Sequence, residues 1–265
     1  MRDNVVVITG ASKGIGAELA RQLAVQGARL ALSGRDTVAL KSVAAACRER
    51  GATMVEAIPA DVAVEQDCQR LIAQTVARFG RLDTLVNNAG VTMWARFADI
   101  RDLGTVARIM QVNYMGSVYC TGHALPHLEA SRGRIVGVAS HTALTGVPTR
   151  SGYAASKHAM RGFFDSLRIE LAGTGVTVTM VYPGFVATGI RENATGPDGK
   201  PVQVNPVDPA NVMSVEECAR QIVVATRRRS RELVMTTRGK LVLLAKPFVP
   251  GLVDRLARRV IERGH

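Results

Sequence analysis

Tyr153 and Lys157 are the pair of residues in this chain whose types and spacing most directly suggest chemistry. A separation of four on a helix places two side chains on the same face, about 5–6 Å apart at Cβ. A phenol has a reference pKa of about 10, and an adjacent ammonium lowers this pKa by favouring the phenolate. Tyr153 could therefore act as a general acid or base, with Ser140 as the hydrogen-bond partner of the reacting oxygen. The alternative is a surface tyrosine beside a solvated lysine.

A glycine-rich turn near the amino terminus gives this pair a reaction partner. Residues 4–9 (NVVVIT) form an apolar, β-branched run that is typical of a buried strand. They lead into Gly10, Gly14 and Gly16, and then into a segment whose leucines and alanines recur at helical spacing. Such a turn can hold a pyrophosphate, because glycines permit close approach and the helix N-terminus presents unpaired N–H groups. A glycine turn without a ligand is the alternative.

The order of the motifs along the chain is more specific than any one of them. The motifs are, in order, TGASKGIG at 9–16, NNAG at 87–90, Asn113, Ser140, Tyr153 with Lys157, and Pro183-Gly184. With these motifs in this order, the chain resembles the short-chain dehydrogenase/reductase family from about Val5 to Val234.

This resemblance implies a role for each residue of the catalytic set. Ser140 would donate a hydrogen bond to the substrate oxygen, and Tyr153 would transfer the proton. Lys157 would hold the nicotinamide ribose and lower the pKa of Tyr153, while Asn113 would hold a water that connects Lys157 to solvent. For Asn113, a polar residue that satisfies a helix kink is the alternative.

The resemblance also implies a set of cofactor contacts. Asp61 would hold the adenine edge, and the NNAG segment would line the cofactor. Val186 and Thr188 would meet the nicotinamide carboxamide, although the Thr188 hydroxyl could equally cap the next helix. The expected cofactor-binding residues are Gly10, Ser12, Lys13, Gly14, Ile15, Gly16, Arg35, Asp61, Val62, Asn87, Ala89, Gly90, Tyr153, Lys157, Pro183, Gly184, Val186 and Thr188.

The end of the second expected strand, residues 29–33, indicates which nicotinamide cofactor is preferred. An enzyme for the unphosphorylated cofactor normally places a carboxylate there, which accepts from the adenosine 2′-hydroxyl. This chain has Gly34 instead, followed by Arg35, whose planar fork matches a 2′-phosphate, and Lys13 adds a second cation. Asp36 is interpreted as the cap of the following helix. NADP(H) is therefore predicted over NAD(H), and a register shifted by two residues would invert the preference.

Apolar strand runs alternate with helical segments along the 265 residues, which favours one α/β domain. The predicted fold is a doubly wound, Rossmann-like domain in which a seven-stranded parallel sheet carries helices on both faces. The dinucleotide-binding and catalytic domain is expected at 1–237, with a mobile lid loop at about 189–212, and a basic amphipathic extension at 238–265. Strands are expected near 4–9, 29–33, 53–58, 82–86, 134–139, 176–181 and 231–235.

The four cysteines are scattered and lack ligand spacing, which indicates neither a zinc site nor a disulfide framework. We therefore expect no metal and reduced, intracellular thiols. Asp3 lies where a signal peptide would be basic, so no secretory segment is expected. The apolar run at 241–245 is far too short to span a bilayer. The expected location is the cytoplasm, with peripheral membrane contact left open.

The positive charge is concentrated near the carboxyl end. From Arg227 onward, eleven basic residues face three acidic ones, a net of +8 out of +12 for the chain. Residues 252–261 carry an apolar stripe at helical spacing, with arginines on the rest of each turn. Such a helix can lie on an anionic membrane surface, or it can dock on its own subunit or on a neighbour. Nucleic-acid binding is disfavoured, because aromatic residues make up only 4% of the chain and no recognition motif accompanies the charge.

Three loops are expected to surround a mostly apolar substrate pocket: 91–94, 141–147 and 189–212. The last carries four prolines and three glycines, which fits a lid. His141 could be a second acid, a pocket-lining donor or a solvent-facing neighbour of Ser140. The pocket should therefore take a hydrophobic ketone or secondary alcohol, steroid-like or lipid-derived. Its expected residues are Met93, Trp94, His141, Leu144, Val147 and Phe185.

The leading hypothesis is an NADP(H)-dependent oxidoreductase that interconverts a hydrophobic ketone or aldehyde and its alcohol. The alternatives are an NAD-dependent alcohol or steroid dehydrogenase, a lyase or epimerase on the same scaffold, and a non-catalytic NADP-sensing protein. A homodimer or homotetramer is expected by resemblance, through helices at about 103–129 and 150–172.

Overall fold

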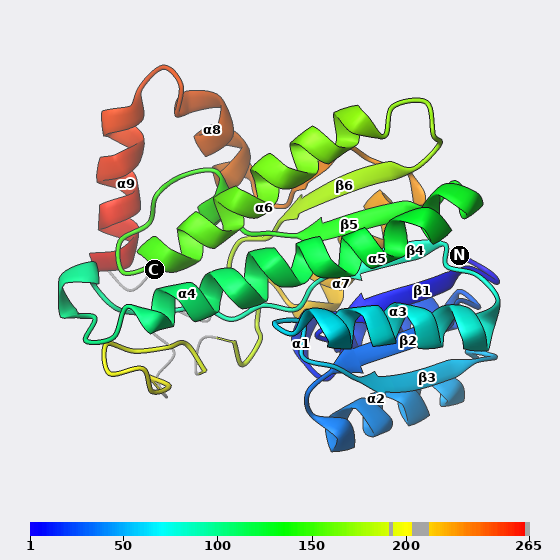
Figure 1. The fold of residues 1–265 in the computed structure, drawn as a ribbon. Coiled ribbons are helices and arrows are strands. Elements are labelled where there is room, and N and C mark those ends of the chain that lie inside the picture. The colour runs from blue at the N-terminus through cyan, green and yellow to red at the C-terminus, as the bar shows by residue number, and fades with distance from the viewer. Residues whose placement is uncertain (191–192, 203–211, 263–265) are drawn as a thin grey trace.

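A seven-stranded, fully parallel β-sheet forms the centre of the molecule (Figure 1). The computed structural model describes residues 1–190, 193–202 and 212–262. The strand order is β3-β2-β1-β4-β5-β6-β7. The chain thus adds β2 and β3 on one side of β1 and then crosses to the other side, where it adds β4 to β7. In open sheets of this kind, the carboxyl ends of the strands at the reversal form a ligand-binding crevice. The predicted doubly wound fold is confirmed.

The strands are short apolar runs, and each of their ends lies within two residues of the predicted position. All five residues of β1 are buried, as expected for a central strand covered on both faces. The strand bounds are β1 (Val5–Thr9), β2 (Arg29–Gly34), β3 (Val55–Pro59), β4 (Thr84–Asn87), β5 (Arg134–Val138), β6 (Thr177–Tyr182) and β7 (Glu232–Val234).

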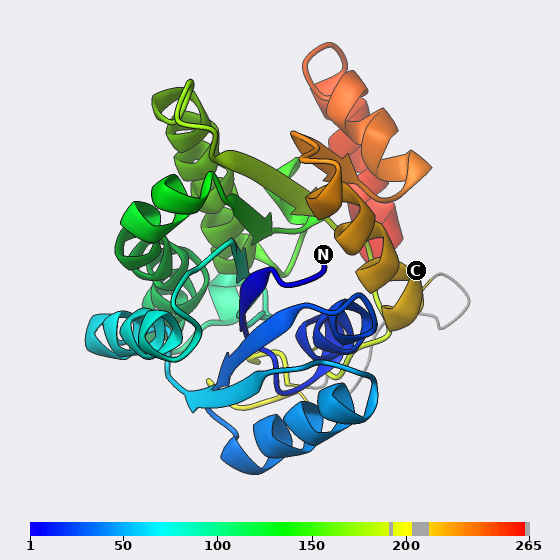
Figure 2. The ribbon, with the colours of Figure 1, turned by 90° about the vertical axis from the view of Figure 1, so that its right-hand side faces the viewer.

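Helices cover both faces of the sheet (Figure 2). One face packs against α1 (Gly14–Val25), α2 (Thr37–Glu49) and α7 (Val215–Arg227), whose apolar sides share a core with the strands. The other face packs against α3 (Glu65–Phe79), α5 (Gly116–Ser131) and α6 (Ser151–Glu170). Each helix therefore buries one apolar stripe and leaves its polar side in solvent.

A π-helical turn interrupts the long helical segment that follows β4. α4 (Gly104–Met110) runs into this turn (Gln111–Met115), which continues directly as α5. Single π-turns within α-helices frequently occur at functional sites. This one carries Asn113, which is fully buried. The helices predicted near 103–129 and 150–172 are thus both present, the first with a local change of helical pitch.

Two further helices lie beyond the carboxyl edge of the sheet. α8 (Thr237–Ala245) and α9 (Pro250–Glu262) form a hairpin on the side toward which β5 and β6 point (Figure 1). Thr236 caps α8, its hydroxyl accepting a hydrogen bond from the Gly239 amide at 3.0 Å. The predicted basic extension is therefore a helical hairpin beside the ligand-binding edge.

The predicted lid loop is only partly covered, because residues 191–192 and 203–211, with Pro206 and Pro209, lie outside the described residues. Within its described part, Thr195 is bonded to the segment after β4. Its amide donates to the Thr92 carbonyl at 2.9 Å, and its carbonyl accepts from the Trp94 amide at 2.9 Å. This part of the loop is therefore held by backbone hydrogen bonds.

Among the described residues, no helix has the length and apolar character needed to cross a membrane. The same residues contain no cluster of His, Cys, Asp and Glu suited to a metal ion. The four cysteines are buried and unpaired by disulfides.

Candidate active site

A cavity of about 1540 Å³ opens along the carboxyl edge of the sheet. It extends from the glycine loop after β1, past the ends of β4, β5 and β6, to the α8–α9 hairpin. Among the described residues that line it, Asp61 is the only carboxylate. The basic lining residues are Lys13, Arg35, Arg150, Lys157, Arg238 and Arg259. The cavity is therefore suited to a ligand with several negative charges.

The glycine loop brings backbone close to backbone at one end of the cavity. Gly10 and Gly14 have φ of +64° and +57°, a conformation that favours glycine. A Cβ on Gly10 would lie 2.8 Å from the Ala89 Cα, and a Cβ on Gly16 would overlap the Gly10 carbonyl. Gly16 is buried and does not line the cavity, so its role is to let α1 approach the loop.

The amino-terminal end of α1 fits a phosphate group. No side chain caps this helix, because Lys13 at the cap position makes no capping hydrogen bond. The first amides of a helix have no intrahelical acceptor and carry the positive end of the helix dipole. Ser12, Lys13 and Ile15 line the cavity at the same place. Backbone donors and an ammonium are therefore available for a pyrophosphate, with no protein acceptor in competition.

Gly34 and Arg35 line the end of the cavity where the sequence predicts the adenosine of a cofactor, which is called the adenosine end below. A Cβ on Gly34 would lie 3.5 Å from the Ser12 hydroxyl, so a carboxylate at position 34 would occupy the space beside the glycine loop. Arg35 is 71% exposed, and its guanidinium lies 3.8 Å from the Asp61 carboxylate. This long, exposed pair contributes little to stability, which leaves the guanidinium available to a ligand.

Asp36 does not take part in this end of the site. Its carboxylate accepts a hydrogen bond from the Ala39 amide at 3.0 Å and caps α2. The sequence-based interpretation of Asp36 as a helix cap is confirmed. Enzymes for the unphosphorylated cofactor are expected to have a carboxylate at this place. Here position 34 is a glycine, and the nearby carboxylate of Asp36 is used to cap α2.

The NNAG segment is tied to the end of β1 and the glycine loop by partly buried hydrogen bonds. The Thr9 hydroxyl accepts from the amides of Asn88 and Ala89, each at 3.0 Å. The Asn88 side chain donates to the Thr9 carbonyl at 2.9 Å. Asn87 lies below the surface, donating to the Thr121 hydroxyl at 3.0 Å, and does not line the cavity. These bonds fix the separation of the loops that follow β1 and β4.

Asn113 joins this segment to α6. Its side-chain oxygen accepts from the Val91 amide at 2.8 Å, and its amide nitrogen donates to the Val91 carbonyl at 3.0 Å and to the Ser156 hydroxyl at 2.9 Å. Asn113 does not line the cavity. Its side chain thus holds the loop after β4 against the helix that carries Tyr153, and the predicted water contact stays a prediction.

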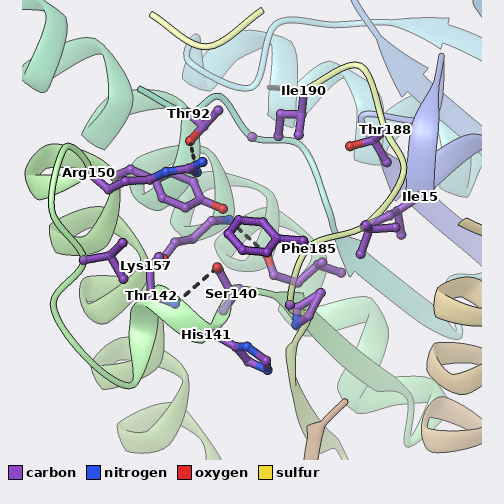
Figure 3. A pocket seen from close by; sticks show the side chains of 18 of the residues that line it. Ile15, Thr92, Ser140, His141, Thr142, Arg150, Lys157, Phe185, Thr188 and Ile190 are labelled. Atoms are coloured by element: carbon purple, nitrogen blue, oxygen red, sulfur yellow. Dashed lines mark hydrogen bonds between the residues drawn. The ribbon is translucent and has the colours of Figure 1, made fainter. Parts of the chain in front are cut away.

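Ser140, Tyr153 and Lys157 meet at the centre of the cavity. Ser140 lies two residues after the end of β5, and its hydroxyl accepts from the Thr142 amide at 3.2 Å (Figure 3). It also forms a hydrogen bond with the Tyr153 hydroxyl. The Lys157 ammonium donates to the Val138 carbonyl at 2.9 Å and lies 5.9 Å from the centre of the Tyr153 ring. The strand end and one face of α6 therefore bring the three together.

Burial dominates the ionisation of both titratable groups. Burial raises the pKa of Tyr153 above 10, and the Arg150 charge and the Ser140 hydrogen bond oppose this shift. Burial lowers the pKa of Lys157 to about 8. The predicted lowering of the Tyr153 pKa by Lys157 is therefore not present as a net effect, because removal of the phenol from water outweighs the cations nearby.

The segment after β4 only partly takes its predicted role as a pocket wall, through Val91 and Thr92, which line the cavity. Met93 and Trp94 do not line the cavity. Met93 is fully buried in a small apolar cluster with Ala95, Ile109 and Tyr153, so it supports the tyrosine from behind. Trp94 instead stacks on the Arg150 guanidinium, which lies 4.4 Å from the centre of its ring. The backbone bonds to Thr195 turn both side chains away from the cavity.

His141, Leu144, Val147 and Phe185 do line the cavity. Figure 3 shows the His141 ring directed away from the Ser140 hydroxyl. Its Nε2 lies 3.4 Å from the Thr236 hydroxyl, and a Cβ on Gly239 would overlap the ring. Burial lowers the pKa of His141, which keeps the ring neutral. This placement favours a pocket-lining residue that packs against α8 over a second acid.

Sequence reasoning missed two parts of the site. Arg150 lines the cavity one turn before Tyr153, and its i,i+3 spacing from the tyrosine was the available signal. The second part is the α8–α9 hairpin, which closes the far end of the cavity. From the sequence alone, no packing partner could be assigned to the apolar stripe of α9. The lining residues on the hairpin are Thr237, Arg238, Gly239, Leu241, Val242, Ala245, Leu252, Val253, Leu256, Ala257 and Arg259.

The buried ammonium of Lys157 should lower the stability of the ligand-free protein. Its folded-state pKa of about 8 lies below its ordinary value of 10.5, so the unfolded chain binds more protons between these values. Stability should therefore rise as pH increases from about 8 to 10.5. We predict that Lys157→Met raises the free energy of unfolding at pH 7 by about 1–3 kcal/mol, with the gain shrinking as the pH rises from about 8 to 10.5.

Urea unfolding of both proteins across this pH range measures the effect. Lys41→Met, which removes an exposed lysine of α2, is the control and should show no such pH dependence. A gain from Lys157→Met that is independent of pH would contradict the assigned desolvation of the ammonium.

Comparison with known proteins agrees with this geometry. A family model described as short chain dehydrogenase matches residues 4–198. The 11-beta-hydroxysteroid dehydrogenase 1A of Arabidopsis thaliana is 40% identical over 259 residues, covering 94% of this chain and 73% of that protein. The 11-beta-hydroxysteroid dehydrogenase of Pinus massoniana is 38% identical over 260 residues, covering 96% of this chain and 73% of that protein.

A solved structure extends the likeness to the fold. The alcohol dehydrogenase from the archaeon Thermococcus sibiricus, complexed with 5-hydroxy-NADP, matches with a TM-score of 0.73 at 25% sequence identity. The match covers 88% of this chain and 94% of that one. The chain therefore belongs to the short-chain dehydrogenase/reductase family and is an oxidoreductase.

Proposed function

We propose that the chain is an NADP(H)-dependent oxidoreductase that interconverts a hydrophobic ketone or aldehyde and its alcohol, with Tyr153 as general acid and base. The observation that carries the proposal is the meeting of Ser140, Tyr153 and Lys157 on the same cavity as the glycine loop. This arrangement offers a proton donor beside a carbonyl oxygen and a dinucleotide site within one continuous space.

In the reducing direction, the residues of the chain hold the substrate oxygen and neutralise its charge. When bound, the nicotinamide supplies the hydride. The Ser140 hydroxyl donates a hydrogen bond to the carbonyl oxygen, and the Tyr153 hydroxyl gives its proton to the developing alkoxide. The nearby ammonium of Lys157 stabilises the phenolate that remains, and in the oxidising direction the same groups act in reverse.

Three features of the adenosine end support a preference for NADP(H). Gly34 leaves space where a carboxylate would stand, Arg35 offers an exposed guanidinium, and Lys13 lies at the helix terminus. A guanidinium binds phosphate through two parallel donors, whereas a carboxylate would repel it. The solved relative complexed with 5-hydroxy-NADP is consistent with this preference. Carbonyl reduction is the proposed physiological direction, because the phosphorylated cofactor is usually held reduced in cells.

The substrate end supports an apolar substrate. His141, Leu144, Val147 and Phe185 line it from the sheet side, and α8 and α9 add leucines, valines and alanines. The related plant proteins are named as hydroxysteroid dehydrogenases, which agrees with a bulky apolar alcohol or ketone. An NAD-dependent alcohol or steroid dehydrogenase remains the second candidate, differing only at the adenosine end.

Tyr153→Phe should remove the transferable proton and spare the fold. Turnover of an apolar ketone should fall by at least about 10³-fold, because the alkoxide would lose its proton donor. The affinity for NADPH should change less than about threefold, since the ring remains in place. NADPH absorbance measures turnover, and fluorescence titration measures binding. Loss of NADPH binding in this variant would show that Tyr153 has been assigned the wrong role.

Arg35→Ala tests the cofactor preference. The variant should weaken NADPH binding by about 10–100-fold, because a charge-assisted contact to the 2′-phosphate is lost. NADH binding should change little, since NADH lacks that phosphate. The measurement is the ratio of the two dissociation constants in wild type and variant. Equal losses for both cofactors would contradict the preference and favour the NAD-dependent alternative.

We also propose that the chain self-associates and that the α8–α9 hairpin contacts an anionic membrane surface. Exposed apolar side chains on α6 and before α4, Ile169 and Leu103, support a dimer or tetramer through these helices. The hairpin combines basic residues with apolar side chains that are 44–85% exposed, a combination that favours anionic interfaces. Those apolar residues are Leu241, Leu244, Phe248, Val249, Leu252 and Leu256.

The hairpin contact is tested with a double variant, Leu244→Ser with Phe248→Ser, which changes neither a cavity-lining nor a catalytic residue. Co-sedimentation with vesicles containing phosphatidylserine should fall about tenfold, and turnover of a water-soluble ketone should not change. Val25→Ser with Val38→Ser removes exposed apolar surface elsewhere and is the matched control. If the hairpin variant instead lowers the mass of the oligomer in sedimentation, the face is covered by a second copy of the chain.

A further inference from the structure

We propose that Arg150 is a second cation that stabilises the phenolate of Tyr153 and thereby sets the pH at which the proposed reaction runs. This inference rests on the proposed function, because it concerns the proton donor of that reaction. Arg150 immediately precedes α6 and belongs to none of the motifs in the sequence. It is a positioning residue, since it acts on the substrate through Tyr153.

Arg150 is a buried charge on the catalytic side of the cavity. Only 6% of its surface is exposed, and it lines the cavity together with Tyr153 and Lys157. Moving a guanidinium out of water is costly, so a charge in this place needs contacts that hold it. Burial also strengthens its field, because less solvent screens a charge inside the protein than at the surface.

The guanidinium is fixed by the segment after β4. Its Nη1 donates to the Thr92 hydroxyl at 3.0 Å (Figure 3), and its central carbon lies 4.4 Å from the centre of the Trp94 ring. Thr92 and Trp94 are both anchored to Thr195 by backbone hydrogen bonds of 2.9 Å. Stacking on tryptophan is the most favourable cation–π geometry and holds the planar group in one orientation.

This orientation places Arg150 as close to the phenol ring as Lys157. The two cationic groups lie 5.8 Å and 5.9 Å from the centre of the Tyr153 ring. Lys157 donates to the Val138 carbonyl, and its lowered pKa of about 8 means that it loses charge in mildly alkaline solution. A guanidinium keeps its charge over the whole working range. Arg150 is thus the constant positive charge facing the tyrosine.

The other groups around Tyr153 do not replace this charge. Ser140, after β5, contributes a hydrogen bond but no charge, and His141 beside it is kept neutral by burial. From the hairpin, Arg238 and Arg259 line the same cavity, whereas its only described carboxylate, Asp61, belongs to the adenosine end. Of these charged groups, Arg150 is the one whose field lowers the pKa of Tyr153 against the effect of burial.

The test measures the ionisation of Tyr153 with and without the guanidinium. Arg150→Met removes the charge and keeps an apolar stem, and Arg150→Lys keeps the charge but loses the planar stack. Ultraviolet difference titration reports tyrosinate, and Tyr153→Phe serves as the blank that isolates this residue among the four tyrosines. The pH dependence of kcat for alcohol oxidation, which needs the phenolate as base, is recorded in parallel.

We expect Arg150→Met to raise the titration midpoint of Tyr153 by about one pH unit and to move the alkaline rise of kcat by the same amount. Arg150→Lys should recover at least half of this shift. Arg161→Met is the matched control, because Arg161 lies on the same helix at 5.8 Å from the Tyr182 ring, and it should leave both midpoints unchanged.

Two results would overturn the proposal: an unchanged midpoint in Arg150→Met, or equal shifts in Arg150→Met and Arg150→Lys, which would indicate a role in shape alone. If Arg150→Met does not fold, Trp94→Ala keeps the charge and removes its stack, and an unchanged midpoint there would count against the proposal. The titration of Tyr153 needs no turnover. If the protein reduces no ketone, the proposed function is contradicted, and the midpoint of the Tyr153 titration still decides this inference.

Discussion

The hydrogen bond from the Lys157 ammonium to the Val138 carbonyl joins α6 to the end of β5, and the catalytic arrangement depends on it. It is a charge-assisted contact of a residue that is only 3% exposed, so it directs the lysine side chain to the strand end. The same bond places Tyr153, one turn earlier, beside Ser140 at the strand end. The position of Tyr153, the proposed proton donor, therefore follows from the junction between one helix and one strand.

Electrostatics divides the cavity into two regions. At the glycine loop, backbone amides and the side chains of Lys13 and Arg35 present positive potential to a phosphorylated ligand. At the catalytic centre, cations lie beside a phenol whose burial opposes ionisation. In the proposed function, positive charge serves cofactor binding in the first region and proton transfer in the second. The near absence of carboxylates along the described lining makes both effects possible, because none is there to neutralise the cations.

The sequence predicted those features that depend on local pattern. Buried strands, the glycine turn between the first strand and helix, and the capping role of Asp36 are properties of short segments, and the structure contains them where expected. Met93 and Trp94 were assigned to the pocket because they follow NNAG, but backbone pairing with Thr195, about a hundred residues away in sequence, turns them elsewhere. The partner of the apolar stripe in α9 is likewise set by tertiary packing. Such distant contacts leave no trace in the spacing of nearby residues.

The family match ends at residue 198, so the hairpin formed by α8 and α9 lies beyond the part of the chain that carries the shared catalytic residues. It connects to that part through β7, through the contact of His141 with Thr236 and Gly239, and through the packing of Val242 and Leu243 against the core. Substitutions in the hairpin can therefore reshape the far wall without displacing the proton donor. Substrate range can diversify in evolution, or be redesigned in the laboratory, as a module separate from the redox chemistry.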